Sequence, residues 1–153
     1  MTTEALPGQV QELIEDFDAV PESDKLQLLL EFSRSLPELP ARYGEHPEDL
    51  EQVVECQSPL FLAVELEEGG GDPGVNIYFS APPEAPTTRG FASILYEGLD
   101  GLPASTVLDI PDDLPERFGL TKLVSPLRMR GMSAMLGRIK RQVRELQAAR
   151  AAG

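Results

Sequence analysis

Apolar residues recur at helical spacing in the first third of the chain. Between residues 6 and 19 they stand three and four positions apart, which predicts an amphipathic helix. Pro21 ends this pattern, and a second helix with an apolar side from Leu26 to Phe32 follows it. Pro37 and Pro40 end the second helix, and we predict that the Pro-rich, polar stretch 37–50 is a loop.

The middle of the chain has the pattern of a β-hairpin. Residues 53–54 suggest a short strand, and residues 60–67 (LFLAVELE) alternate between two faces, with Leu62, Val64 and Leu66 on one of them. The Gly-rich stretch 69–74 has the composition of a turn, and residues 75–79 (VNIYF) form the returning strand. We therefore expect the two strands to form a hairpin.

The remainder is predicted to be mainly helical. Helices are expected within residues 86–99, after Pro103 and within residues 113–118. A long closing helix starts at Ser125, which can cap it, and Pro126, which suits a first turn. Its apolar stripe runs from Met132 to Leu146. This order predicts the α+β class, with a small antiparallel sheet flanked by helices.

The length of 153 residues suits one domain, 1–153, in which we expect 1–8 and 148–153 to be flexible ends. A membrane span and a signal peptide are not apparent, so we expect no membrane partner and a cytoplasmic location. The net charge of −13 argues against nucleic acid as a partner. However, residues 128–153 contain 7 of the 13 basic residues and one acidic residue. That segment is either a solvated helix face or a docking patch for a protein.

Cys56 is the lone cysteine, so it cannot form a disulfide within the chain or hold a Cys-based zinc site or iron–sulfur cluster by itself. It lies between a polar loop and an apolar strand, where it is either a small buried hydrophobe or a thiol at an exposed tip. Glu55 would raise the pKa of that thiol, whereas a cation brought in by the fold would lower it. The lone histidine, His46, is either a surface residue or the base of a small Cys hydrolase.

Four short motifs resemble those of SufE-type proteins, in the same order. They are 36–39 (LPEL), 56–58 (CQS) before an apolar strand, 84–90 (EAPTTRG), and 125–131 (SPLRMRG) before the closing helix. The resemblance covers roughly residues 10–147. Two positions depart from it: Glu55 stands where the family often has Gly, and residues 60–61 are Leu-Phe where it often has Val-Trp.

The resemblance implies a SufE/IscU-like α+β fold and a sulfur-transfer role. The implied partner is a PLP-dependent, SufS-like cysteine desulfurase, which SufE-type proteins stimulate, and the sulfur then passes to an Fe–S scaffold. Cys56 matches the persulfide acceptor, Arg128 matches an arginine near the acceptor loop, and Glu84 matches an acidic position. No metal and no cofactor of its own are expected. The alternatives are an interaction domain with an inert Cys56, or a Cys hydrolase using His46.

Overall fold

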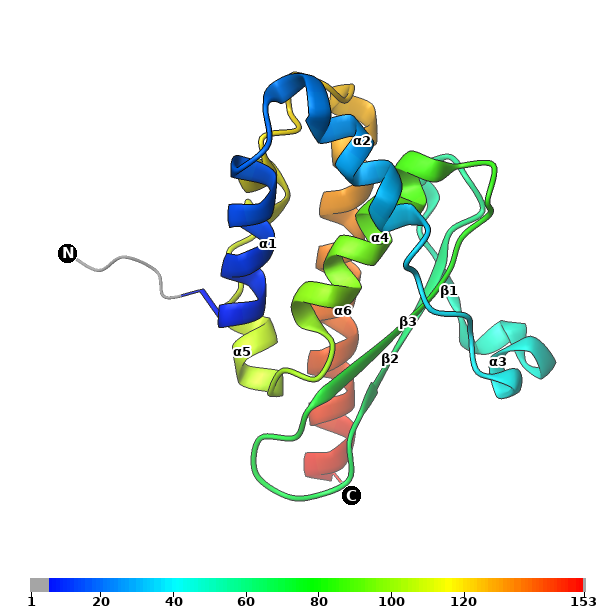
Figure 1. Ribbon diagram of the computed structural model, residues 1–153. Coiled ribbons are helices and arrows are strands. Elements are labelled where there is room, and N and C mark those ends of the chain that lie inside the picture. The colour runs from blue at the N-terminus through cyan, green and yellow to red at the C-terminus, as the bar shows by residue number, and fades with distance from the viewer. Residues whose placement is uncertain (1–5, 153) are drawn as a thin grey trace.

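The computed structural model describes residues 6–152 and places a small sheet beside a set of helices (Figure 1). The α-helices are α1 (Gly8–Asp18), α2 (Glu22–Ser33), α3 (Ala41–Glu45), α4 (Pro86–Leu99), α5 (Ala104–Asp109) and α6 (Pro126–Ala152). The strands are β1 (Glu51–Gln52), β2 (Phe61–Leu66) and β3 (Val75–Ser80). Three short 3₁₀ helices are η1 (Pro47–Asp49), η2 (Val54–Cys56) and η3 (Leu114–Phe118).

The strands form one antiparallel sheet in the order β1-β2-β3. Alternate residues of β3, namely Val75, Ile77 and Phe79, are buried toward the helices, as the period of two requires. Helix α6 packs along β2, and α4 packs against β3. The predicted α+β class, with a small antiparallel sheet flanked by helices, is confirmed.

The close packing of helix α4 against helix α2 depends on Gly90 in α4. A Cβ at this position would lie 2.7 Å from the carbonyl oxygen of Leu29 in α2, so only glycine lets the two helices approach this closely. Arg89 strengthens the same junction, because its guanidinium donates to the carbonyl oxygens of Ser33 at 3.1 Å and Ala81 at 2.6 Å. The motif at 84–90 therefore has a packing role at the start of α4.

The stretch 37–50, predicted as a loop, instead contains α3 and η1. Tertiary contacts explain the difference, because α3 covers the sheet face that turns away from the core. Tyr43 is buried there, with its ring 5.2 Å from that of Tyr78, and its hydroxyl donates to Glu65 at 2.6 Å. These partners lie outside the 37–50 segment, so local composition does not reveal them.

The short strand expected at residues 53–54 was misplaced. The pairing lies at Glu51–Gln52, and the chain then turns into η2. Val53 still donates to the Leu60 carbonyl at 2.9 Å, but the amide of Cys56 donates back to Val53 at 3.1 Å. This second bond closes a turn and ends the strand.

The C-terminal residues 148–152, expected to be a flexible end, continue helix α6. Arg150 donates to the carbonyl oxygens of Leu66 and Glu67, each at 3.0 Å, and so joins α6 to the hairpin turn beside it (Figure 1). At the other end, α1 begins at Gly8. The rest of the two expected flexible ends, residues 1–5 and 153, lies outside the described residues.

Candidate functional site

The thiol of Cys56 stands at the end of a tight turn that follows the edge strand β1. Cys56 closes η2, and Gln57 then adopts a left-handed backbone with φ of 56°. This conformation is uncommon for a residue other than glycine. Leu60 next begins the buried path into β2. Cys56 is partly buried, so its thiol is neither deep in the core nor fully in solvent.

Helix α6 supports this turn through a glycine. A Cβ at Gly131 would lie 3.1 Å from Sγ of Cys56 and 3.3 Å from its Cα. Any larger residue would therefore press on the turn, and glycine lets Cys56 rest against the helix. The SPLRMRG motif ends at this residue, so its last position has a direct structural reason.

A pocket of about 200 Å³ opens beside the thiol. It is lined by Glu55, Cys56, Gln57, Ser58, Ser125, Leu127 and Arg128. Arg128 reaches it because Ser125 caps α6: the amide of Arg128 donates to the Ser125 hydroxyl at 3.2 Å. The fold thus brings two predicted site residues, Cys56 and Arg128, to one pocket. Leu127, which is 42% exposed, is the apolar side chain of this lining.

Burial is the main influence on the pKa of the Cys56 thiol. It raises the pKa of Cys56 to about 11, with a further upward contribution from the Glu55 carboxylate and a downward one from the Arg138 guanidinium. The upward effect of Glu55 is the one predicted from the sequence. Arg138 is the cation that the fold brings in, and it pairs with Glu55 at 2.9 Å and with Glu51 at 3.1 Å.

Arg138 was not among the predicted site residues. The basic composition of residues 128–153 was the available signal, but that signal does not distinguish one arginine from another. Arg138 lies near Cys56 because β1 and η2 place the acidic side chains of Glu51 and Glu55 opposite the middle of α6. Arg141 joins the same group by pairing with Glu51.

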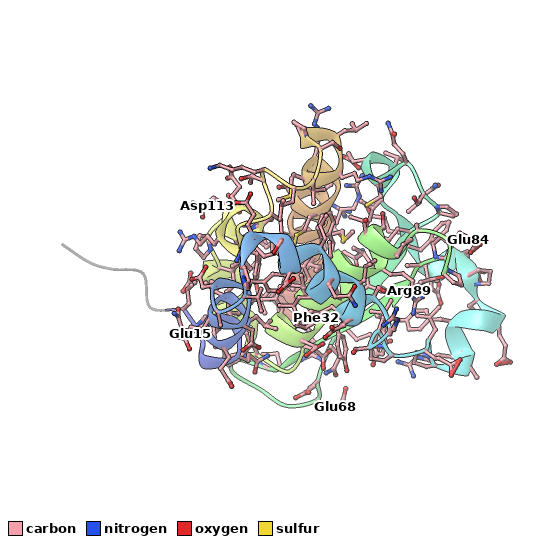
Figure 2. All side chains as sticks on the ribbon, turned by 45° about the horizontal axis from the view of Figure 1, so that its top comes forward. Glu15, Phe32, Glu68, Glu84, Arg89 and Asp113 are labelled. Carbon is pink, nitrogen blue, oxygen red and sulfur yellow. The ribbon has the colours of Figure 1, made fainter. Side chains whose placement is uncertain are left out.

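The other two candidates lie away from this pocket. Glu84 is exposed at the outer edge of the loop that leads into α4 (Figure 2), and it does not line the pocket. His46 pairs with Glu48 at 3.0 Å; both side chains are largely exposed, and His46 does not line the pocket either. The structure therefore gives the Cys56 thiol no histidine base in this arrangement.

The comparisons with known proteins agree with the architecture. The SufE profile, described as an Fe–S metabolism associated domain, matches residues 11–143. The chain belongs to the SufE family. Through that membership it is associated with Fe–S metabolism.

Several relatives extend the match to nearly the whole chain. SufE-like proteins from two strains of Mycobacterium tuberculosis are 54% identical over 142 residues, covering 92% of this chain and 95% of theirs. The chloroplastic/mitochondrial SufE-like protein 1 of Arabidopsis thaliana is 26% identical, over 94% of this chain and 37% of that longer protein. The solution structure of a protein from Thermus thermophilus superposes with a TM-score of 0.79 at 36% identity, covering 94% of this chain and 99% of that one.

No group of three or more His, Cys, Asp and Glu side chains placed to hold a metal ion occurs within residues 6–152. Over the same residues, no helix combines the length and apolar character that crossing a bilayer requires.

Proposed function

We propose that the protein accepts sulfur as a persulfide on Cys56, from a PLP-dependent, SufS-like cysteine desulfurase. In this proposal it stimulates that enzyme by removing its sulfur and passes the sulfur on to an Fe–S scaffold in the cytoplasm. One observation carries the proposal: the lone thiol stands on a tight turn at the mouth of a pocket, with an arginine at the rim. Membership of the SufE family supports it.

The transfer is a thiol exchange and needs only one cysteine on this chain. The Cys56 thiolate attacks the outer sulfur of the desulfurase persulfide, forming a new S–S bond. The old S–S bond breaks, and the donor thiolate leaves with its electron pair. No external oxidant or reductant is consumed, because the outer sulfur moves between two equivalent thiols. The proton of the Cys56 thiol must leave before the attack.

The raised pKa makes the described arrangement a resting state. With the pKa of Cys56 at about 11, only on the order of 10⁻⁴ of the thiol is ionised at pH 7. This protects the cysteine from oxidation and alkylation between transfers. A partner that draws the η2 turn away from α6 removes the burial that raises the pKa of Cys56. The thiolate then forms next to the persulfide of the desulfurase.

Arg128 is assigned a role at the same stage. It stands at the exposed rim of the pocket, in the first turn of α6, where a cation opposes the helix macrodipole. A guanidinium there stabilises the anionic thiolate and persulfide, or binds the desulfurase. Glu84 lies outside the pocket, so its assignment depends on the resemblance of residues 84–90 alone, with partner contact as its available role.

Mass spectrometry of the intact protein tests the proposal. Incubation with a SufS-like desulfurase and free cysteine should add one sulfur, about 32 Da, to Cys56. Cys56→Ser should fold normally, gain no mass and lose all stimulation of the desulfurase, because a hydroxyl holds no persulfide. Stimulation retained by Cys56→Ser would show that the protein acts by contact and not by accepting sulfur.

One variant and one measurement on the wild type separate this proposal from the alternatives. His46→Ala should accept sulfur as the wild type does, whereas a Cys hydrolase using that histidine would lose its activity. An interaction domain with an inert cysteine would bind its partner yet show no added mass on wild-type Cys56. The mass change therefore separates the acceptor from both alternatives, and the His46→Ala variant separates a Cys hydrolase from an interaction domain.

A further inference from the structure

Helix α6 contains a glycine that the packing of the chain does not explain. Gly137 lies in the middle of the helix, where glycine is less favourable than alanine because of its greater backbone freedom. A Cβ added at Gly137 would meet nothing within 4 Å, whereas one at Gly131 would press on Cys56. The space over Gly137 is thus open toward the outside, which allows another backbone to approach closely.

Two hollows meet at this glycine. One, of about 330 Å³, is also lined by Asp112, Ser133, Leu136, Lys140 and Arg144. The other, of about 290 Å³, is also lined by Glu51, Ala134, Arg138 and Arg141. Both include Gly137 itself. We call this surface the α6 groove: its floor is Ser133, Ala134 and Gly137, and its rim is Arg138, Lys140, Arg141 and Arg144. The floor is made of small residues. Three of the four rim cations are paired within the chain: Arg138 with Glu51 and Glu55, Lys140 with Asp112, and Arg141 with Glu51 and Glu145.

The rim has positive charge that the chain does not neutralise completely. Lys140 is the main cause that lowers the pKa of Asp112, and exposed Arg144 adds a smaller downward contribution. Arg144 forms no ion pair or hydrogen bond with any residue in the described part of the chain. Arg130, exposed just before the floor, has no such partner within residues 6–152 either. Arg144 on the rim and Arg130 before the floor therefore leave positive charge that complements acidic side chains of a partner.

We infer that the α6 groove docks an acidic helix of the cysteine desulfurase that delivers sulfur to Cys56. The inference rests on the proposed function. The groove is continuous with the sulfur site, because Arg138 lines the groove and pairs with Glu55 in the Cys56 pocket. Gly131 and Gly137 are only about 9 Å apart along the helix axis. A protein that docks over the Cys56 pocket can therefore also reach the groove.

Two features favour a helix from another protein over a second copy of this chain. Ser133 and Gly137 are four residues apart, so their small side chains follow one line along α6, and a helix fits against that line. Two copies of a chain with net charge −13 repel each other. An acidic element of a different protein gains the attraction of the rim without that repulsion.

Steady-state kinetics of the desulfurase, titrated with this protein as acceptor, test the inference. Gly137→Leu fills the floor with a good helix former and should raise the acceptor KM by roughly fivefold or more, as loss of a central interface contact does. The kcat at saturation should stay within about twofold, because Cys56 and its pocket are unchanged. Ala148→Leu is the control: it adds the same side chain to an exposed position of α6 three turns beyond, and should leave KM unchanged.

A charge reversal gives a second, independent measurement. Arg144→Glu should raise KM and weaken its dependence on salt, whereas Arg34→Glu, at an exposed arginine that follows α2, should do neither. Thermal denaturation checks that each variant is folded. An unchanged KM for folded Gly137→Leu and Arg144→Glu would overturn the inference.

The same assay distinguishes this failure from failure of the proposed function. If the wild type itself takes no sulfur and does not stimulate the desulfurase, the proposed function is wrong, and the inference with it. If the wild type accepts sulfur and only the groove variants behave as wild type, the proposed function stands and the groove is not the docking surface.

Discussion

The contact between Gly131 and Cys56 gives the sharpest test of the site's geometry. We predict that Gly131→Ala pushes the η2 turn outward from α6. The new methyl group would lie 3.1 Å from Sγ of Cys56, about 0.5 Å closer than favourable contacts allow. The turn, which is partly exposed and ends a short 3₁₀ helix, yields more readily than the middle of α6.

Two opposing terms set the effect on stability. Replacing a helical glycine by alanine stabilises a helix by about 1 kcal/mol, whereas overpacking costs about 1–3 kcal/mol. Gly131→Ala should therefore change the free energy of unfolding by between about zero and 2 kcal/mol in the destabilising direction. Gly137→Ala in the same helix meets nothing within 4 Å, and should stabilise the protein by about 1 kcal/mol.

The second readout is the pH dependence of Cys56 alkylation by iodoacetamide. Outward movement of the turn exposes the thiol, so its pKa should fall below the wild-type value of about 11, toward the ordinary 9.0. The full difference would raise the thiolate fraction at neutral pH about a hundredfold. Gly137→Ala should leave the profile unchanged. If Gly131→Ala matches Gly137→Ala in both stability and pH profile, Cys56 does not rest on α6 and the described site is wrong.

Other substitutions probe charge, packing and chemistry separately. Glu55→Gln should lower the pKa of Cys56, by less than Gly131→Ala can because burial is the larger cause, and alkylation at pH 8 should accelerate correspondingly. The contribution of Cys56 to the free energy of unfolding should be fully present below about pH 9 and be lost as pH rises through 11, because the folded state holds the Cys56 proton more tightly. Urea titrations across this range measure the slope, and Cys56→Ser should remove this part of it. Arg128→Ala should keep thermal stability nearly unchanged yet slow persulfide formation on Cys56, and wild-type uptake by the folded variant would remove Arg128 from the site. Gly90→Ala should destabilise the fold by about 1–3 kcal/mol in the same titration, since its Cβ would lie 2.7 Å from the Leu29 backbone oxygen, and no loss would show that α2 and α4 pack less closely than described.

The long, periodic elements were predictable because their patterns are local. Helices α1, α2, α4 and α6 and the β2–β3 hairpin all appear within a few residues of the predicted ranges. Each has an apolar period, a proline or a Gly-rich turn that marks its limits. The short α5 and η3 also appear where they were predicted, after Pro103 and within residues 113–118. By contrast, α3 and η2 were not predictable, because they depend on partners elsewhere in the chain, such as Tyr78 for Tyr43 and Leu60 for Val53.

The candidate site likewise has a part that the sequence predicts and a part that it does not. Cys56 is identifiable from the sequence because it is the lone cysteine and stands between a loop and an apolar strand, and the 125–131 motif points to Arg128. The sequence also indicates the sign of the Glu55 effect, because neighbours in the chain are close in any fold.

The tertiary structure alone decides how far the thiol is buried, which glycine supports it and which arginine opposes Glu55. Burial and Coulomb interactions depend on distances between segments, and a linear sequence does not contain those distances. Gly131, Gly137 and Arg138 are therefore ordinary members of one helix in the sequence. In the fold they become the support of the turn, the floor of a groove and the cation beside the thiol.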